Sequence, residues 1–329
     1  MDKGKEIRFG QSEREPLIDR IPLDVPLSLA VEPTSACNFK CKYCEQSLGL
    51  HDAKTGFTSK FLKMDLFCKM IDDIASSGKR IKALNLVRFG EPLLNKHLPE
   101  MIDYAKSSNV FDRIVTVSNG SLLNPELSLA LVNAGLDRIL ISIQGITSEK
   151  YYELCGVKVD FQKLVDNIKY FYMNRGKCKL FLKVFYEGID GNKDAFAKIF
   201  SDICDEYSFE HIVPFSSDID YQNMNLSEMK DRYGDDVKRV DVCAVPFYIL
   251  SVLSNGDVSA CCNSNDSSFT LGNISKDSVL ELWNSEKLKS IQTLHLSRQR
   301  YSHNICGNCN FPIYGMPESD NLDAIASSF

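Results

Sequence analysis

The sequence predicts an α/β protein in which six β/α units form a partial barrel and a small α+β domain follows. Three observations support this fold class. Short apolar runs alternate with amphipathic helical patterns at a repeat of roughly 25 to 35 residues, which is typical of consecutive β/α units. The dipeptide Asn255-Gly256 lies between alternating apolar residues and predicts a hairpin. Most of the 12 cysteines gather in two groups, which indicates metal or redox sites rather than disulfides.

The expected elements follow from the period of the apolar residues. Strands are expected at 28–32, 83–89, 113–118, 138–143, 180–186 and 211–215. Apolar stripes at i, i+3 and i+4 predict helices at 64–74, 97–105, 125–134, 161–172 and 195–204. The hairpin is expected at 247–260 and a further helix at 278–294. Because barrels of this kind build their sites at the carboxyl ends of the strands, functional residues are expected in the loops that follow each strand.

Four segments are expected along the chain. Residues 1–26 form a polar N-terminal extension, too short to be a peptide-recognition domain, and 27–217 form the partial barrel. Residues 218–242 are rich in charged and amide side chains and are interpreted as a linker or a substrate-side loop. Residues 243–329 form the second domain.

Composition limits the classes of partner. The chain has 329 residues, of which 44% are hydrophobic and 25% charged, as in an ordinary globular protein. A net charge of −6 argues against a nucleic acid or an anionic membrane as a general partner. The longest apolar run, 245–253, is too short to span a bilayer, and the first 16 residues carry no apolar signal segment. We therefore expect a cytoplasmic protein with neither a nucleic-acid nor a membrane partner.

The first cysteine group follows the first expected strand and contains Cys37, Cys41 and Cys44. A [4Fe–4S] cluster has four irons, so three thiolates leave one iron open for chemistry. The alternative is a structural zinc ion with a fourth ligand elsewhere in the chain.

The spacing of this loop, with an aromatic residue before its last cysteine, resembles that of the radical S-adenosylmethionine (radical SAM) enzymes. Three later segments at expected strand ends also resemble the polar motifs of that family: Phe89-Gly90-Glu91-Pro92, Ser118-Asn119-Gly120 and Ser142-Ile143-Gln144. The sequence departs from the family pattern at Phe89, where a glycine is usual, and at Gln144, where an aspartate is common. By this resemblance, the contacts to S-adenosylmethionine are Tyr43, Gly90, Glu91, Pro92, Ser118, Asn119 and Ser142. Lys183 on the fifth strand is a further candidate, although an ordinary barrel lysine is the simpler interpretation.

The second cysteine group lies in the C-terminal domain and contains Cys243, Cys261, Cys306 and Cys309, at intervals of 18, 45 and 3 residues. Four thiolates without an open position predict a cluster that stores or passes electrons, with structural zinc as the alternative. The pattern Gly256-x4-Cys261, followed by Leu271-Gly-Asn-Ile274 and Leu280-Glu-Leu-Trp-Asn284, resembles the SPASM extension of radical SAM enzymes. It resembles the shortened single-cluster form, called a twitch domain. Cys262 is not required by this ligand set, and its role stays open.

The resemblance implies two [4Fe–4S] clusters, S-adenosylmethionine, and an external electron donor such as flavodoxin or ferredoxin. Within this family, the chain is similar to the dehydrogenases that oxidise 2-deoxy-scyllo-inosamine and to related sugar epimerases. It thus implies a 5′-deoxyadenosyl radical that abstracts hydrogen from a carbohydrate or cyclitol carbon, oxidising a secondary alcohol to a ketone with the auxiliary cluster as electron acceptor. The alternatives are a sugar epimerase, a maturase of a ribosomal peptide, and a zinc-binding scaffold without enzymatic activity.

Neither the base nor a hydrogen donor is fixed by the sequence. The candidate bases lie near the expected barrel mouth and are Asp218, Asp220, Tyr221, His211 and Glu187. Candidate thiol donors for an epimerase are Cys155, Cys204 and Cys262, although an inert packing role is the simpler interpretation of each.

Overall fold

The computed structural model describes residues 3–8, 15–47, 49, 61–216, 219–221, 230–264 and 266–326. Its strands are β1 (Lys5–Glu6), β2 (Ser28–Val31), β3 (Ile81–Leu86), β4 (Phe111–Ser118), β5 (Arg138–Ile143), β6 (Lys179–Phe185), β7 (Glu206–Glu210), β8 (Ile249–Val252), β9 (Asp257–Ser259) and β10 (Thr270–Asn273). Its α-helices are α2 (Met64–Ser76), α3 (Leu98–Ser107), α4 (Pro125–Asn133), α5 (Ser148–Cys155), α6 (Phe161–Asn174), α7 (Lys193–Phe200), α8 (Val279–Trp283), α9 (Glu286–Leu296) and α10 (Phe311–Tyr314).

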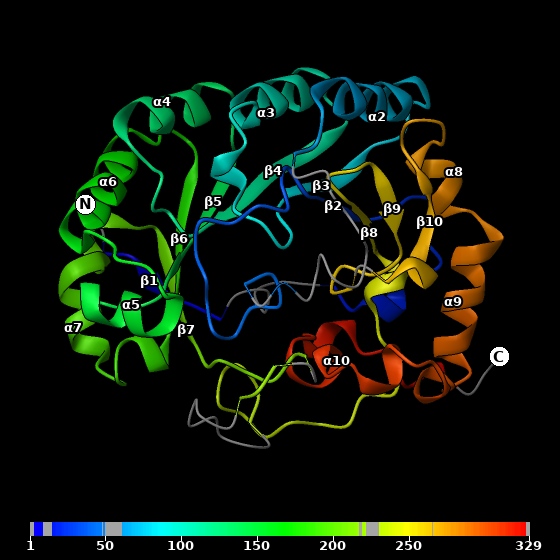
Figure 1. The fold of residues 1–329 in the computed structure, drawn as a ribbon. Coiled ribbons are helices and arrows are strands. Elements are labelled where there is room, and N and C mark those ends of the chain that lie inside the picture. Colours follow the sequence, from blue (N-terminus) through cyan, green and yellow to red (C-terminus); the bar gives the residue numbers. More distant parts are fainter. Residues whose placement is uncertain are drawn as a thin grey trace.

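One curved, mostly parallel sheet organises the molecule. The strand order is β1-β7-β6-β5-β4-β3-β2-β8-β9-β10, and all neighbours from β1 to β8 pair in parallel. Helices α2, α3, α4, α6 and α7 lie along the convex side of this sheet (Figure 1). The predicted fold class, a partial barrel of six β/α units, is confirmed.

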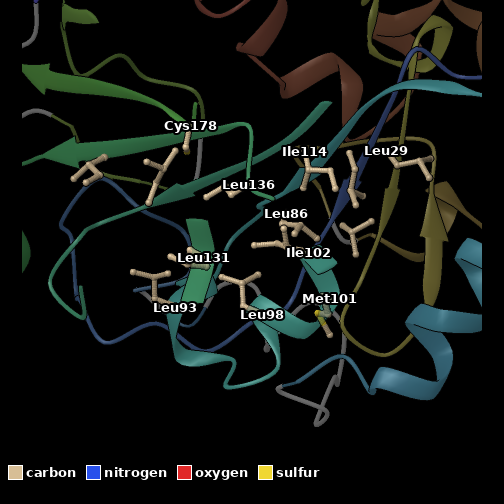
Figure 2. Close-up of a cluster of buried hydrophobic side chains, with 14 of the residues drawn as sticks. Leu29, Leu86, Leu93, Leu98, Met101, Ile102, Ile114, Leu131, Leu136 and Cys178 are labelled. Atoms are coloured by element: carbon tan, nitrogen blue, oxygen red, sulfur yellow. The ribbon is translucent and has the colours of Figure 1, made fainter. Parts of the chain in front are cut away.

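The core lies between the strands and the outer helices. In α2 the buried residues Phe67, Met70, Ile71 and Ile74 recur at helical spacing and face the sheet. On β2, Leu29 and Val31 are fully buried in the same cluster, part of which Figure 2 shows. Because neighbouring strand residues point to opposite faces, the residues between them line the inside of the barrel.

Inside the barrel, an apolar layer lies below a polar one. Val115, Leu140 and Phe181 form a small cluster separate from the main core. Two residues further along their strands, toward the carboxyl ends, the corresponding positions on β5 and β6 are Ser142 and Lys183, which pair in register. Apolar side chains therefore fill the barrel interior toward the amino ends of the strands. Polar side chains lie at the carboxyl ends, where the site is expected.

The last strand of the barrel differs from the prediction. We expected it at 211–215, but β7 is Glu206–Glu210, and 211–216 has no regular structure. The alternation explains the error: Tyr207 and Phe209 pack outward, while the polar residues between them face the barrel interior. The apolar residues at 212 and 213 gave the stronger sequence signal although they lie beyond the strand.

The C-terminal region extends the same sheet. The predicted hairpin is confirmed, with β8 and β9 antiparallel and Gly256 at φ +89° in the turn between them. Because β8 also pairs in parallel with β2, the second domain continues the barrel sheet rather than standing apart from it. The helix expected at 278–294 is two helices, α8 and α9, since Ser285 caps the N-terminus of α9 by accepting the Leu288 N–H.

Four further elements were not predicted. They are β1, which pairs with β7, the short helix α5 between β5 and α6, β10 at the edge of the sheet, and the short helix α10. Among the helices of the described residues, none has the length and apolar character needed to cross a membrane. The expected boundaries at 26, 217 and 242 stay predictions, and part of 218–242 lies outside the described residues.

Candidate functional site

The loop after β2 carries the first three cysteines and is anchored on α5. The backbone N–H groups of Lys40 and Lys42 donate to the carbonyls of Cys155 and Leu154, at 2.9 and 3.0 Å, where α5 ends. Phe39 is buried beside Tyr151 with its ring edge on. These contacts hold the loop at the carboxyl ends of the strands, as expected from the sequence.

The three thiols differ in exposure. Cys41 is buried, Cys44 is half-buried and Cys37 is exposed. A hydrogen bond with the buried thiol of Cys155, together with burial itself, raises the pKa of Cys41. Burial likewise raises the pKa of Cys44. Thiols in such surroundings ionise only when a cation is supplied, and metal coordination deprotonates a thiol outright. The assignment of Cys37, Cys41 and Cys44 as ligands of the first cluster stays a prediction.

The Gly90-Glu91-Pro92 segment packs directly on that loop. A Cβ atom on residue 90 would lie 2.0 Å from the carbonyl oxygen of Thr34 and 2.7 Å from that of Ala36. The Glu91 N–H donates to the Ala36 carbonyl at 2.8 Å. We expected Gly90 to allow a ligand to approach the backbone closely. In the structure the absence of a side chain lets the backbone at Thr34 and Ala36, which leads into the cysteine loop, pack against it.

The Glu91 carboxylate joins the ends of β3 and β4. It is 3% exposed, and it accepts hydrogen bonds from the Leu93 N–H at 3.0 Å, the Ser118 hydroxyl at 2.7 Å and the Asn119 N–H at 2.7 Å. Burial raises the pKa of Glu91, while these three hydrogen bonds oppose that effect. Three of the four lone-pair directions of this carboxylate are thus already used by the chain itself.

A ring of amide and hydroxyl groups continues from Asn119 back to the cysteine loop. The Asn119 side chain donates to Asn38 Oδ1 at 2.8 Å, and Asn38 donates to the Ser121 hydroxyl at 2.9 Å. Ser121 closes the ring by donating to Asn119 Oδ1 at 2.7 Å. Sequence reasoning missed Asn38, although its place directly after Cys37 was a usable signal.

Tyr43 connects the cysteine loop to the end of β5. Its hydroxyl donates to Gln144 Oε1, and its ring meets Phe185 edge on at a centroid distance of 5.1 Å. Burial raises the pKa of Tyr43, so the phenol stays protonated and keeps donating. The Tyr43 side chain therefore makes a directed hydrogen bond to Gln144 in addition to its packing contact with Phe185. Of the seven predicted cofactor contacts, Glu91, Ser118 and Asn119 share one hydrogen-bond network, and Gly90 and Pro92 flank Glu91 in the chain. Tyr43 bonds separately to Gln144, and Ser142 pairs in register with Lys183.

Charged side chains line the barrel interior near these loops. Burial lowers the pKa of Lys183, and the nearby Glu210 carboxylate opposes this effect. Glu210 is 4% exposed and lies 3.9 Å from the Arg232 guanidinium, measured between the charged atoms. Sequence reasoning missed Glu210 because it expected β7 five residues too late, and it missed Arg232 because this residue lies in the charged segment 218–242.

The second cysteine group surrounds one cavity of about 270 Å³. Its lining includes all four predicted ligands, Cys243, Cys261, Cys306 and Cys309. Burial raises the pKa of each of these thiols, for Cys306 to about 12. The residues that the structure describes contain no three histidine, cysteine or acidic side chains gathered around a single ion position. In a [4Fe–4S] cluster each cysteine binds a different iron, so the four thiolates are spread around the group.

The two cysteine groups are close to one another. Glu45, which directly follows Cys44, lines the cavity of the second group. Arg88, which follows β3, donates from Nη2 to the carbonyls of Cys261 at 3.1 Å and Ser264 at 2.8 Å. Cys262 is half-buried and does not belong to the cavity lining, which agrees with Cys261 as the ligand.

Comparison with known families decides the class of the protein. A family model described as the radical SAM superfamily matches residues 31–199, just over half of the chain. This chain belongs to the radical SAM superfamily. A second model, described as an iron-sulfur cluster-binding domain of the SPASM type, matches residues 243–310. The cofactors of this radical SAM enzyme are therefore S-adenosylmethionine and more than one [4Fe–4S] cluster, as predicted.

Curated relatives match only part of the chain. GTP 3′,8-cyclase of Chlorobaculum tepidum is 37% identical over 120 residues, which are 36% of this chain and 33% of the relative. AdoMet-dependent heme synthase of Methanosarcina barkeri is 30% identical over 146 residues, which are 44% and 39% of the two chains. The match thus spans between a third and two-fifths of the length of these relatives.

Two solved structures match along nearly their whole length. BtrN in complex with AdoMet and 2-DOIA has a TM-score of 0.59 at 18% identity, covering 87% of this chain and 93% of that one. AnSMEcpe with bound AdoMet has a TM-score of 0.62 at 17% identity, covering 91% and 92%. At these identities the likeness shows the radical SAM fold alone.

The candidate base residues of the radical SAM enzyme fall in different places. His211 Nδ1 lies 3.1 Å from Glu187 Oε1, and its ring stacks on Tyr186, which packs on the outer residue Phe209. Burial raises the pKa of Tyr221 to about 12. Asp218 lies outside the described residues. Of the candidate thiols, Cys204 precedes β7 and so lies at the end of the barrel opposite the site.

Proposed function

We propose that this radical SAM enzyme is a dehydrogenase that oxidises a secondary alcohol of a carbohydrate or cyclitol to a ketone. The observation that carries the proposal is the position of the second cysteine group. Its cavity is lined by Glu45, the residue after Cys44, so an acceptor held there lies beside the site where hydrogen is removed. Oxidation of a substrate radical needs such an acceptor close at hand.

The chain's residues divide into three sets. Cys37, Cys41 and Cys44 are proposed to hold the first cluster, and Cys243, Cys261, Cys306 and Cys309 the auxiliary one. The proposed contacts to S-adenosylmethionine are Tyr43, Gly90, Glu91, Pro92, Ser118, Asn119 and Ser142. When bound, these groups supply a 5′-deoxyadenosyl radical that removes a hydrogen atom and an acceptor for the remaining electron.

The chain itself has to supply a base for the hydroxyl proton, and Lys183 is the candidate that its surroundings support. Burial lowers its pKa, which increases the fraction of neutral amine available to accept a proton. Glu210 and Arg232 near it provide both signs of charge for the polar groups of a substrate. Such a set of charged side chains inside a barrel fits a hydroxylated substrate of small size better than an apolar one.

The likeness to BtrN supports the same class of substrate. That structure holds AdoMet and 2-DOIA, and this chain spans 93% of it. We further propose that residues 27–217 form the radical SAM barrel and 243–329 the auxiliary-cluster domain, with electrons delivered by a flavodoxin or ferredoxin. Epimerisation of a sugar is the variant in which a hydrogen atom is returned to the substrate carbon instead of an electron being removed.

Maturation of a peptide is the second candidate, favoured by other matches. AnSMEcpe with bound AdoMet and Cp18Cys peptide has a TM-score of 0.58 and is covered over 91% of its chain. SuiB of Streptococcus suis bound to precursor peptide SuiA has a TM-score of 0.55 and is covered over 77%. PqqA peptide cyclase of Granulibacter bethesdensis is 29% identical over 135 residues.

The test is turnover by the anaerobically reconstituted enzyme with S-adenosylmethionine, reductant and three substrate panels: aminocyclitols including 2-deoxy-scyllo-inosamine, nucleotide sugars, and cysteine- or serine-containing peptides. The proposal expects a product two mass units lighter than an alcohol substrate, with one 5′-deoxyadenosine per product. A product that has the composition of the substrate and has gained one deuterium from the solvent would indicate an epimerase. Modification of peptides alone would refute the carbohydrate proposal and favour maturation.

A further inference from the structure

His295, on α9, makes a directed contact with one of the auxiliary cysteines. Its side chain is buried, with 1% exposure, and lines the cavity of the four cysteines. The backbone N–H of Cys243 donates to His295 Nδ1 at 3.3 Å, while Nε2 lies 3.8 Å from Cys306 Sγ. A nitrogen that accepts a hydrogen bond carries no proton, so the neutral ring has its proton on Nε2. His295 therefore donates a hydrogen bond to the sulfur of Cys306.

Arg300 lies against the same pair of cysteines. It is 1% exposed, and its Nη1 donates to the carbonyls of Cys306 at 3.1 Å and Cys309 at 3.2 Å. Its Nη2 donates to the Tyr301 hydroxyl at 3.1 Å, and its Nε has no hydrogen-bond partner among the described residues. No carboxylate in the described part of the chain comes within ion-pair distance of this guanidinium.

A buried guanidinium without an anion is unfavourable unless another group supplies the negative charge. Four thiolates around an iron–sulfur cluster carry a net negative charge, and they would lie in the cavity that Arg300 also lines. The buried cation and the imidazole donor thus both face the same side of the cluster position, next to Cys306 and Cys309. Each one stabilises added negative charge there, which is what reduction of a cluster produces.

We infer that His295 and Arg300 set the reduction potential of the auxiliary cluster, raising it so that the cluster accepts an electron readily. Hydrogen bonds to the sulfurs and the local net charge are among the main determinants of such potentials. The inference rests on cluster binding by the four cysteines and on no particular substrate. Both residues act through the cluster and are positioning residues rather than catalytic ones.

The test is a redox titration followed by electron paramagnetic resonance. The background chain carries Cys37→Ala, Cys41→Ala and Cys44→Ala, so that the auxiliary cluster is the only one present. On this background His295→Phe removes the donor, whereas His295→Gln keeps an N–H group. Arg300→Met removes the charge, whereas Arg300→Lys keeps it. The matched control is Arg298→Met, which neutralises a surface arginine paired with Asp241.

We expect His295→Phe and Arg300→Met each to lower the equilibrium constant for reduction about tenfold, which is about 59 mV for one electron. The variants that keep the donor or the charge should shift less, and Arg298→Met should not shift. Unchanged potentials in both removal variants, with iron still bound, would overturn the inference.

A second measurement covers the case in which a variant fails to bind iron. In the unsubstituted enzyme labelled with ¹⁵N-histidine, the reduced auxiliary cluster should show a nitrogen coupling in pulsed electron paramagnetic resonance. The coupling should persist in His303→Gln, since His303 Nδ1 accepts from the backbone N–H of Cys306 at 3.3 Å and makes no contact with its sulfur in the described residues. Absence of any histidine coupling would refute the His295 contact. Because neither measurement involves turnover, a wrong assignment of the substrate would not affect the result.

Discussion

The Glu91 carboxylate offers the sharpest mutational test of how the first site is held together. Glu91→Gln keeps the shape of the side chain but replaces one carboxylate oxygen with an NH₂ group. One oxygen can still accept from the Leu93 N–H and the Ser118 hydroxyl. The Asn119 N–H, which donates to the other oxygen at 2.7 Å, then faces a second donor and loses its acceptor.

The size of the effect follows from opposing contributions. A hydrogen bond to a charged group contributes about 1.5–3 kcal/mol, and an unsatisfied buried donor costs about 1–3 kcal/mol, although these two overlap. Burial opposes the charge and raises the pKa of Glu91, so removing the charge returns part of this loss. We therefore expect Glu91→Gln to lower the free energy of unfolding by about 2 kcal/mol.

The assay is equilibrium unfolding of the iron-free chain in guanidinium, followed by circular dichroism and by the emission of the single, buried tryptophan, Trp283. Glu126→Gln is the control, since Glu126 is exposed in the first turn of α4 and its change should cost less than about 0.5 kcal/mol. If Glu91→Gln unfolds at the same denaturant concentration as the control, the carboxylate does not hold β3 and β4 together as described.

Three further predictions test other parts of the structure. Gly90→Ala places a Cβ atom 2.0 Å from the Thr34 carbonyl, so iron analysis should show loss of the first cluster with retention of the auxiliary one; full iron content would contradict this packing. Burial raises the pKa of Asp205, but the hydrogen bonds from Arg175 and the Leu180 N–H and the nearby positive charges together outweigh this effect, so the net pKa lies below the ordinary value. The stabilisation by ionised Asp205 is present above the unfolded pKa and is lost as the pH falls. Asp205→Asn should therefore be about 2 kcal/mol less stable than the unsubstituted protein at neutral pH, and the unfolding curves of the two proteins should converge below about pH 4. A stability difference independent of pH would disprove the role of the ion pair. Lys183→Met should reduce ketone formation by about 10²-fold or more while cleavage of S-adenosylmethionine persists, and unimpaired product formation would exclude Lys183 as the base.

Much of the architecture could be predicted because its signals are local. The cysteine loop follows a short apolar strand, and the polar tripeptides at 118–120 and 142–144 begin in the last residues of β4 and β5, as the rule that sites lie at strand ends predicts. The hairpin at Asn255-Gly256 could be predicted for the same reason, since Gly256, at φ +89°, has a backbone conformation that favours glycine.

The errors arose where tertiary structure overrides local pattern. The strand β7 exposes Glu206, Ser208 and Glu210 to the barrel interior, so its sequence lacks the apolar run that marks a buried strand. The same misplacement hid Glu210 as a site residue.

The second site shows a different limit of sequence reasoning. His295 and Arg300 gain their meaning only when α9 and the segment after it bring them against Cys243, Cys306 and Cys309. Nothing in their immediate sequence distinguishes them from surface residues. Likewise, Glu91 was assigned to the cofactor, and its three hydrogen bonds within the chain became visible only in the structure.

The central claim, two separate but adjacent clusters in one radical SAM enzyme, is tested most directly by iron and acid-labile sulfide analysis with electron paramagnetic resonance. We expect about eight irons per chain in the reconstituted enzyme and about four in each of two variants, in which either the three or the four cysteines are replaced by alanine. Only the variant lacking Cys37, Cys41 and Cys44 should lose 5′-deoxyadenosine formation completely. A colourless zinc protein, or continued cleavage of S-adenosylmethionine without those three cysteines, would contradict the account.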